Sequence, residues 1–130
     1  MISRRSRVSQ ALTIGVAGIA AFALSAGNAH ANWSGKAIRV QPSGKVAGSA
    51  SFVAKGDRLT VCDTVADGYS VSVTVYDESA GGKKIYTVKA GGKGKCTPGT
   101  KNLTEGHTYS FWSDTSGSTG GMARIATDKA

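Results

Sequence analysis

The stretch that decides the fold is Tyr69-Ser70-Val71-Ser72-Val73-Thr74-Val75-Tyr76. Its valines alternate with serine and threonine, so an extended chain here has one apolar side and one polar side. A two-residue period of this kind is typical of a β-strand that packs one face against a hydrophobic core. The stretch therefore predicts a strand over residues 69–76.

The same alternation recurs on both sides of this strand. It predicts further strands over residues 33–41, 46–53, 59–62, 84–89, 107–114 and 122–127. Small residues and glycines separate them, as in Ser79-Ala80-Gly81-Gly82, while residues 90–102 lack alternation and are predicted to be a loop. About seven short strands with turns every 8–12 residues predict an all-β fold, a single antiparallel β-sandwich with a small barrel as the alternative.

Residues 1–31 have the three parts of a secretory signal peptide. Arg4, Arg5 and Arg7 are basic, residues 11–24 are apolar, and Ala29-His30-Ala31 is a small-x-small cleavage site. As a helix the apolar part would span about 21 Å, less than the roughly 30 Å of a bilayer core. We expect cleavage after Ala31 and export of residues 32–130 as one domain, with only transient membrane contact through the leader.

Two cysteines, Cys62 and Cys96, fall in the exported part. In an oxidising compartment such a pair predicts a disulfide. The exported part keeps a single histidine, His107, so a metal site is not expected there.

Basic residues outnumber acidic ones by 16 to 8 in the whole chain, and part of the excess is local. One segment contains six lysines and no acid, namely Lys83, Lys84, Lys89, Lys93, Lys95 and Lys101. Such a segment is a candidate surface for a polyanion such as an anionic cell-wall polymer, although a solvated lysine-rich surface is the simpler reading. The segment has no arginine and only one aromatic residue, Tyr86, so we expect no nucleic-acid partner.

The residues needed for catalysis are sparse. A hydrolase of the triad type needs a nucleophile, a base and an orienting group. His107 is predicted in a corner turn, and no serine, Ser70, Ser110 and Ser113 included, lies in a recognisable nucleophile motif. The only glutamates, Glu78 and Glu105, are both predicted in turns. Asp63 and Asp67 precede Gly68 too sparsely for a calcium loop and more simply cap a turn. We therefore expect a non-enzymatic protein without a cofactor.

Two tryptophans, Trp33 and Trp112, are candidate contacts for sugars or for a partner protein. Trp112 follows Phe111 and therefore faces the opposite side of its strand from Tyr109 and Phe111. If those two residues are in the core, Trp112 is at least partly exposed. A structural use of Trp112, covering a sheet edge, is the alternative.

The segment Leu103-Thr-Glu-Gly-His-Thr-Tyr109-Ser-Phe111 resembles the corner before the sixth strand of fibronectin type III and other immunoglobulin-like domains. The resemblance implies a buried Leu103 and a Tyr109 hydroxyl that bonds back to the turn. The whole chain is also similar to small secreted proteins of unknown function from filamentous actinobacteria, through Gly56-Asp57-Arg-Leu-Thr-Val-Cys62-Asp63 and the later Cys96. That likeness implies a fold and a compartment but no catalytic residues.

These observations predict a small secreted binding or structural protein at the cell surface, monomeric, whose partner is a wall polymer or a surface protein. The alternative is a secreted effector, either a cationic antimicrobial protein or a protease inhibitor that presents the loop Gly91–Thr100. One disulfide is few for effectors of this size, which favours the first hypothesis.

Overall fold

The computed structural model describes residues 32–130, and the predicted signal peptide lies outside them. These residues form eight strands and one short 3-10 turn. The elements are β1 (Trp33–Val40), β2 (Lys45–Val53), β3 (Arg58–Asp63), β4 (Ser70–Asp77), η3 (Glu78–Ala80), β5 (Lys83–Gly91), β6 (Lys95–Thr100), β7 (Thr108–Thr115) and β8 (Ala123–Lys129). The seven strands predicted from the sequence are all present, while β6 was not predicted.

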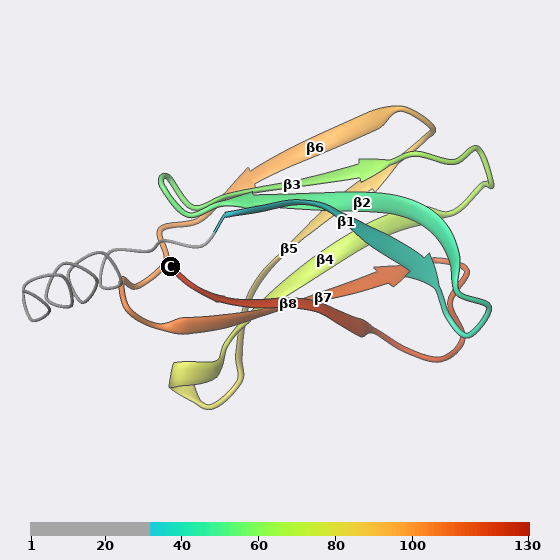
Figure 1. Cartoon of the computed structure of the whole chain (residues 1–130). Helices are drawn as coiled ribbons and strands as arrows, with labels where there is room; N and C mark the ends of the chain where they lie inside the picture. The colour runs from blue at the N-terminus through green and yellow to red at the C-terminus, as the bar shows by residue number, and fades with distance from the viewer. Residues whose placement is uncertain (1–31) are drawn as a thin grey trace, which may run out of the picture.

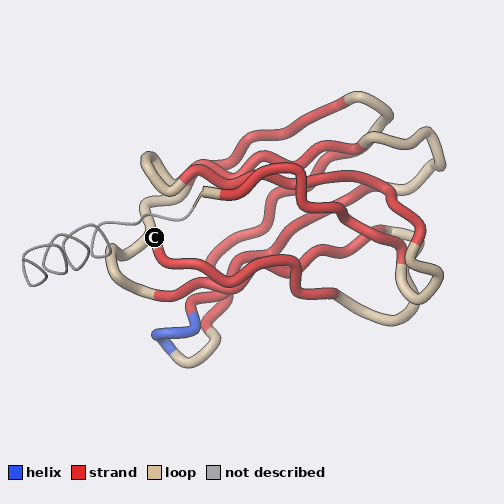
Figure 2. Tube along the Cα trace, in the orientation of Figure 1, coloured by secondary structure: helices blue, strands red, loops and turns tan. Residues whose placement is uncertain are grey.

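The strands form two four-stranded antiparallel sheets, β1-β2-β3-β6 and β5-β4-β7-β8. The two sheets lie one above the other with long strands throughout, and η3 lies in the turn between β4 and β5 (Figures 1 and 2). The chain crosses from one sheet to the other after β3, after β5 and after β6. The predicted fold class, an all-β antiparallel sandwich, is confirmed.

The core lies between the sheets and is formed by the apolar side of each alternating strand. Val71, Val73 and Val75 of β4 are all fully buried, as the opening pattern predicts. Phe52 and Phe111 come from opposite sheets, and their ring centroids are 4.9 Å apart. Trp33 is partly buried and packs against the same rings at 6.1 Å and 5.1 Å, so it contributes to the core.

The prediction of a loop over residues 90–102 is wrong for its central part. Residues Lys95–Thr100 are strand β6, which pairs with β3 along its whole length. Pro98 is tolerated because β6 is an edge strand, where one side of the backbone needs no ladder partner. The exposed loop Gly91–Thr100 that a protease inhibitor would present is therefore absent from this sandwich.

The disulfide between Cys62 and Cys96 is present and joins residues that are directly opposite each other in β3 and β6. Their Cα atoms are 4.0 Å apart. The bridge therefore fixes β6, which lies in the segment predicted to be a loop, to the neighbouring strand of its sheet. On the inner side of β6, Gly99 lies against Val88 of β5, where a Cβ atom would overlap the valine side chain.

The corner between β6 and β7 has the geometry that its sequence implies. Leu103 and Tyr109 are buried, with 5% and 2% of their surface exposed. The hydroxyl of Tyr109 accepts a hydrogen bond from the backbone N–H of Thr104 at 2.8 Å. Gly106, between them, has a φ of +83°, a backbone conformation that glycine adopts without steric cost.

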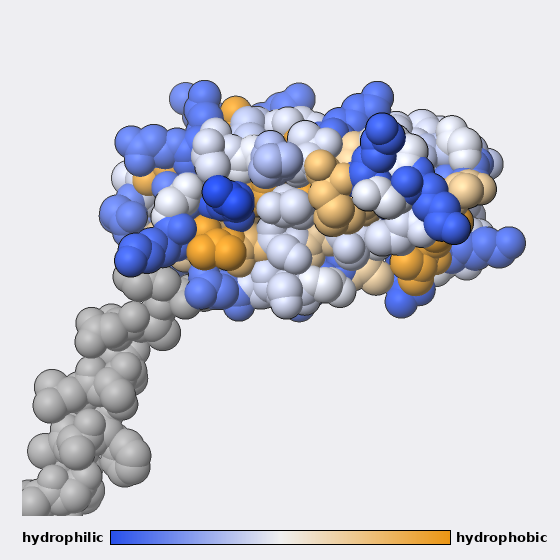
Figure 3. All heavy atoms as spheres, turned by 90° about the horizontal axis from the view of Figure 1, so that it is seen from above, coloured by the Kyte–Doolittle hydropathy of each residue, from blue (hydrophilic) through white to orange (hydrophobic). Residues whose placement is uncertain are grey.

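Seen from above, strongly hydrophilic residues gather mainly toward the two ends of the face, near-neutral residues fill much of its middle, and apolar residues form separate patches (Figure 3). Within residues 32–130, no helix is long and apolar enough to cross a membrane.

Candidate functional site

The six lysines singled out in the sequence do not form one surface. Lys83 and Lys84 begin β5, whereas Lys93 and Lys95 lie at the turn that follows its last residue. Across the length of β5 these pairs are about 26 Å apart. Strand β6 then returns along the sandwich, so Lys101 follows its far end. A run of lysines that is continuous in sequence is thus divided between the two ends of the fold.

The turn between β5 and β6 is short and well held. The carboxylate of Asp63 accepts a hydrogen bond from the backbone N–H of Gly92 at 2.8 Å, and its backbone carbonyl accepts one from Gly94 at 2.7 Å. The other carboxylate oxygen of Asp63 accepts from Val65, and Asp67 accepts from Tyr69. Both aspartates therefore hold turn backbone, which is the simpler of the two roles that the sequence left open.

Tyr86, the one aromatic residue within the lysine segment, is directed into the sandwich and not toward a ligand. It packs against the core, and its hydroxyl oxygen is buried. Burial raises the pKa of Tyr86 to about 12, and the negative charge of Asp57 adds to this effect. The segment therefore offers no aromatic surface of its own.

The outer face of the β5-β4-β7-β8 sheet brings Trp112 together with two of the predicted lysines. Trp112 pairs with Thr74 of β4, and Tyr76, two residues further along β4, pairs with Lys84 of β5. Lys89 pairs with Ser72 on the same face. Directly paired residues share a face of the sheet, so these side chains border one surface.

The indole ring of Trp112 is fixed by a short chain of hydrogen bonds. Its Nε1–H donates to the hydroxyl of Ser110 at 2.9 Å, and that hydroxyl donates to the carboxylate of Glu78. Ser110, the middle residue of this chain of hydrogen bonds, is fully buried. Because both partners of the relay are satisfied, the ring has a defined orientation while it remains only half-buried.

Arg124 of β8 stacks on this ring. Its guanidinium carbon lies 5.5 Å from the indole centroid, and Arg124 pairs directly with Trp112 in the sheet. Such a cation–π contact fixes the arginine as well as the tryptophan. The stacked pair borders two hollows, since Trp112 lines one and Arg124 lines the other.

The hollow beside Trp112, called here the Trp112 hollow, has a volume of about 240 Å³. Its lining is mostly apolar and comes from Tyr76, Glu78, Gly82, Trp112 and Met122. Met122 is 40% exposed. A shallow aromatic surface with a carboxylate at its margin can hold a molecule that has both apolar faces and hydroxyl groups.

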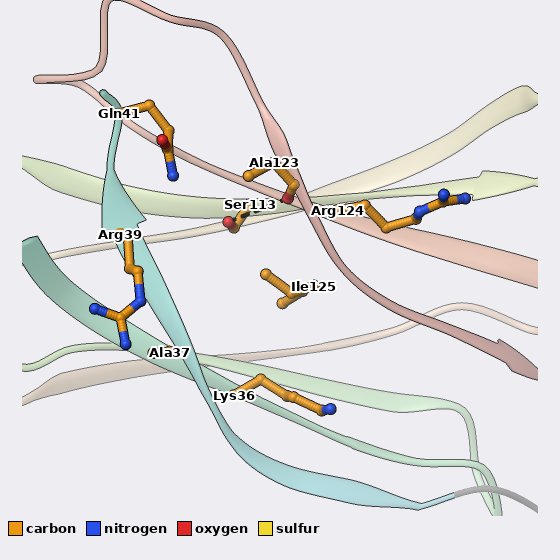
Figure 4. A pocket seen from close by; sticks show the side chains of 8 residues that line it. All are labelled: Lys36, Ala37, Arg39, Gln41, Ser113, Ala123, Arg124 and Ile125. Atoms are coloured by element: carbon orange, nitrogen blue, oxygen red, sulfur yellow. Dashed lines mark hydrogen bonds between the residues drawn. The ribbon is translucent and has the colours of Figure 1, made fainter. Parts of the chain in front are cut away.

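The second hollow, called here the edge hollow, lies between β1 and β8, the edge strands of the two sheets (Figure 4). Its volume is about 330 Å³. Basic side chains from both strands line it, namely Lys36, Arg39 and Arg124, with Gln41 and Ser113 beside them. Lys36, Arg39 and Arg124 were not predicted as a site, because none of them belongs to a run of basic residues and Arg124 is far along the chain from the other two.

The carboxylates and the histidine do not assemble into one reactive group. His107 Nδ1 lies 2.8 Å from Oδ2 of Asp77, which is buried at the end of β4. Glu78 and Glu105 line different hollows. Among residues 32–130 there is no group of three His, Cys, Asp or Glu side chains placed to hold a metal ion.

Comparison with known proteins adds little. No family model and no curated protein matches the chain. One solved structure, described as an endonuclease/exonuclease/phosphatase from Beutenbergia cavernae DSM 12333, is similar at 19% sequence identity with a TM-score of 0.40. The similarity covers 78% of this chain but 27% of that one, and it is too low to bear on fold or activity.

Proposed function

We propose that this protein is an exported, non-enzymatic binding protein that holds a glycan polymer of the cell surface against Trp112. The observation that carries the proposal is the fixed orientation of a half-exposed tryptophan, held through Ser110 and Glu78. A ring that is already immobile loses little conformational entropy when a ligand packs on it. Sugar rings present apolar C–H faces and hydroxyl groups, which suit the aromatic lining and the carboxylate of the Trp112 hollow.

Export is supported by the signal-like residues 1–31 together with the Cys62–Cys96 bridge, since disulfides persist in oxidising compartments. An immunoglobulin-like relationship is supported by the Tyr109 corner and by the crossing of the chain between sheets on either side of β6. Domains of that class commonly serve in binding at cell surfaces, which agrees with the proposed role.

The test is co-sedimentation of the purified protein with insoluble chitin, cellulose and bacterial cell wall. Trp112→Ala removes the platform and should lower affinity for the bound polymer about tenfold or more. Tyr69→Ala is the matched control, because Tyr69 is 42% exposed and lines a hollow separate from Trp112. Equal losses in the two variants, or binding by none of the polymers, would reject the proposal.

A second variant separates orientation of the ring from its mere presence. Ser110→Ala keeps Trp112 but removes the acceptor for its Nε1–H and the donor to Glu78. If the fixed ring matters, this variant should bind the polymer about threefold to tenfold more weakly while its circular dichroism spectrum stays that of the parent. Unchanged affinity would mean that orientation plays no part in binding.

A further inference from the structure

The edge hollow lies on the side of the sandwich where the two sheets are least closely joined. On the other side, Val88 of β5 packs directly against Gly99 of β6. Between β1 and β8 a space of about 330 Å³ remains instead, with Ala37 and Ile125 on its inner surface (Figure 4). The space is open to solvent along two exposed edge strands, so a chain-like ligand has access to it.

All the charged residues that line this space are basic. Lys36 and Arg39 come from β1 and Arg124 from β8, and no aspartate or glutamate is among the lining residues. Ser113 and Gln41 add neutral hydrogen-bonding groups. The carboxyl group of Asp128 is close enough to interact with the charge of Lys36. Burial raises the pKa of Asp128, and the positive charge of Lys36 offsets part of this rise. The local surplus of positive charge favours an anionic ligand.

Two of the three cations are held in place before any ligand arrives. Nη1 of Arg39 donates to the backbone carbonyl of Gly44 at 2.8 Å, and Arg124 stacks on Trp112. A guanidinium group has five N–H donors, so one hydrogen bond leaves most of them free. Anchored arginines bind anions at a smaller entropy cost than freely moving side chains do.

The three charged groups do not converge on one point. Figure 4 shows the three side chains well apart: Lys36 and Arg124 extend the same way from different strands, and Arg39 is turned away from both. Lys36 and Arg39 are also three residues apart along an extended strand, which corresponds to about 10 Å. One small anion cannot contact all three groups, whereas a chain with acidic groups at intervals can.

We propose that the edge hollow binds the acidic groups of an anionic polysaccharide, whose sugar rings continue onto Trp112. Arg124 connects the two sites, because it lines the edge hollow and stacks on the tryptophan. The inference rests on the proposed function for the glycan class, and it adds the charge of the ligand and the residues that select it. The polyanion surface expected from the lysine segment is thereby replaced by Lys36, Arg39 and Arg124.

The experiment compares the purified protein on dextran sulfate and on unmodified dextran, which share one backbone and differ in charge. The double variant Lys36→Gln, Arg39→Gln should weaken binding to dextran sulfate about tenfold and leave any binding to dextran unchanged. The double variant Lys55→Gln, Lys101→Gln removes two charges that do not line the edge hollow and should weaken it less than about twofold. Thermal unfolding of each variant shows whether the fold is retained.

Equal losses in the two double variants would overturn the inference, because the charges would then act only diffusely. Competition by millimolar inorganic sulfate would also overturn it, since a single small anion would then fill the site. Tighter binding to duplex DNA than to dextran sulfate would replace the polysaccharide by a nucleic acid. Trp112→Ala separates the two proposals: a loss on both dextrans supports the glycan platform, and a loss confined to the Lys36, Arg39 variant supports the edge hollow alone.

Discussion

The Tyr109 hydroxyl accepts a hydrogen bond from the backbone N–H of Thr104 at 2.8 Å and so closes the turn through which the chain passes from β6 into β7. Tyr109 is buried against the core and lies at the start of β7. The same side chain therefore anchors the corner and fills space between the sheets. This bond joins residues only five positions apart, yet it fixes the crossing of the chain from one sheet to the other.

Tyr109→Phe tests this corner by removing only the hydroxyl group. The N–H of Thr104 then loses its acceptor in a partly buried site, which should lower the free energy of unfolding by about 1–2 kcal/mol. Urea unfolding followed by far-ultraviolet circular dichroism measures the difference. Tyr69→Phe, at an exposed tyrosine, is the control and should change stability by less than about 0.5 kcal/mol. A Tyr109→Phe variant as stable as the parent would contradict the role of the bond.

The alternating stretches predicted the fold well because each strand buries one side. The valines of β4 and the pair Tyr109 and Phe111 of β7 are all buried where alternation places them. Trp112, out of phase with that pair, lies on the outer face for the same reason. One-sided burial leaves a clear trace in the sequence, so strand positions and faces could be predicted.

Strand β6 could not be predicted, because its sequence Lys-Cys-Thr-Pro-Gly-Thr has no apolar alternation. Three tertiary contacts make it a strand: pairing with β3, the disulfide, and the packing of Val88 on Gly99. The stacking of Arg124 on Trp112 also depends on the register between β7 and β8, which is shifted just before Trp112. Contacts between distant strands leave no local pattern, so the edge hollow could not be found from the sequence.

The disulfide should stabilise the fold mainly by holding β6. Cys62→Ser, Cys96→Ser removes a bridge between residues 34 positions apart and should lower the free energy of unfolding by about 2–4 kcal/mol. Amide hydrogen exchange should increase most in residues 95–100, because β6 is an edge strand with one ladder partner. The intact mass of the parent should be about two hydrogens below that of the reduced chain. Two free thiols in the denatured, unreduced parent would contradict the pairing.

The pair His107 and Asp77 should make the protein more resistant to acid. Burial alone would raise the pKa of Asp77, but the hydrogen bond and charge of His107 and the backbone N–H groups of Ser79 and Ala80 outweigh it and lower the pKa. A carboxyl group with a lowered folded-state pKa stabilises the fold above its unfolded pKa of about 3.9, and this stability is lost as the pH falls through the folded value.

His107→Gln should therefore shift the acid-unfolding midpoint to higher pH, because the pKa of Asp77 then moves back toward its ordinary value. Circular dichroism recorded at low salt between about pH 6 and about pH 2 measures the midpoint. Lys93→Gln removes a positive charge in the turn after Gly91, which pairs with Ser70 at the other end of β4 from Asp77, and should leave the midpoint close to that of the parent. If both variants unfold at the parent's pH, the histidine does not protect the carboxylate.

Gly99→Ala should destabilise the sandwich through one specific overlap. The added Cβ would meet Cγ2 of Val88, which lies directly against Gly99 where β5 and β6 approach each other. Gly99 has no positive φ, so the cost comes from crowding and not from backbone conformation. Overpacking of this kind costs about 1–3 kcal/mol.

Val88→Ala alone should cost about 1–2 kcal/mol by leaving a cavity, since Val88 is buried with only 5% of its surface exposed. The double variant should recover part of both losses, because the smaller side chain at position 88 leaves room for the new methyl group. Urea unfolding of the four proteins gives the coupling energy, and strictly additive losses would show that the two residues do not determine each other's size.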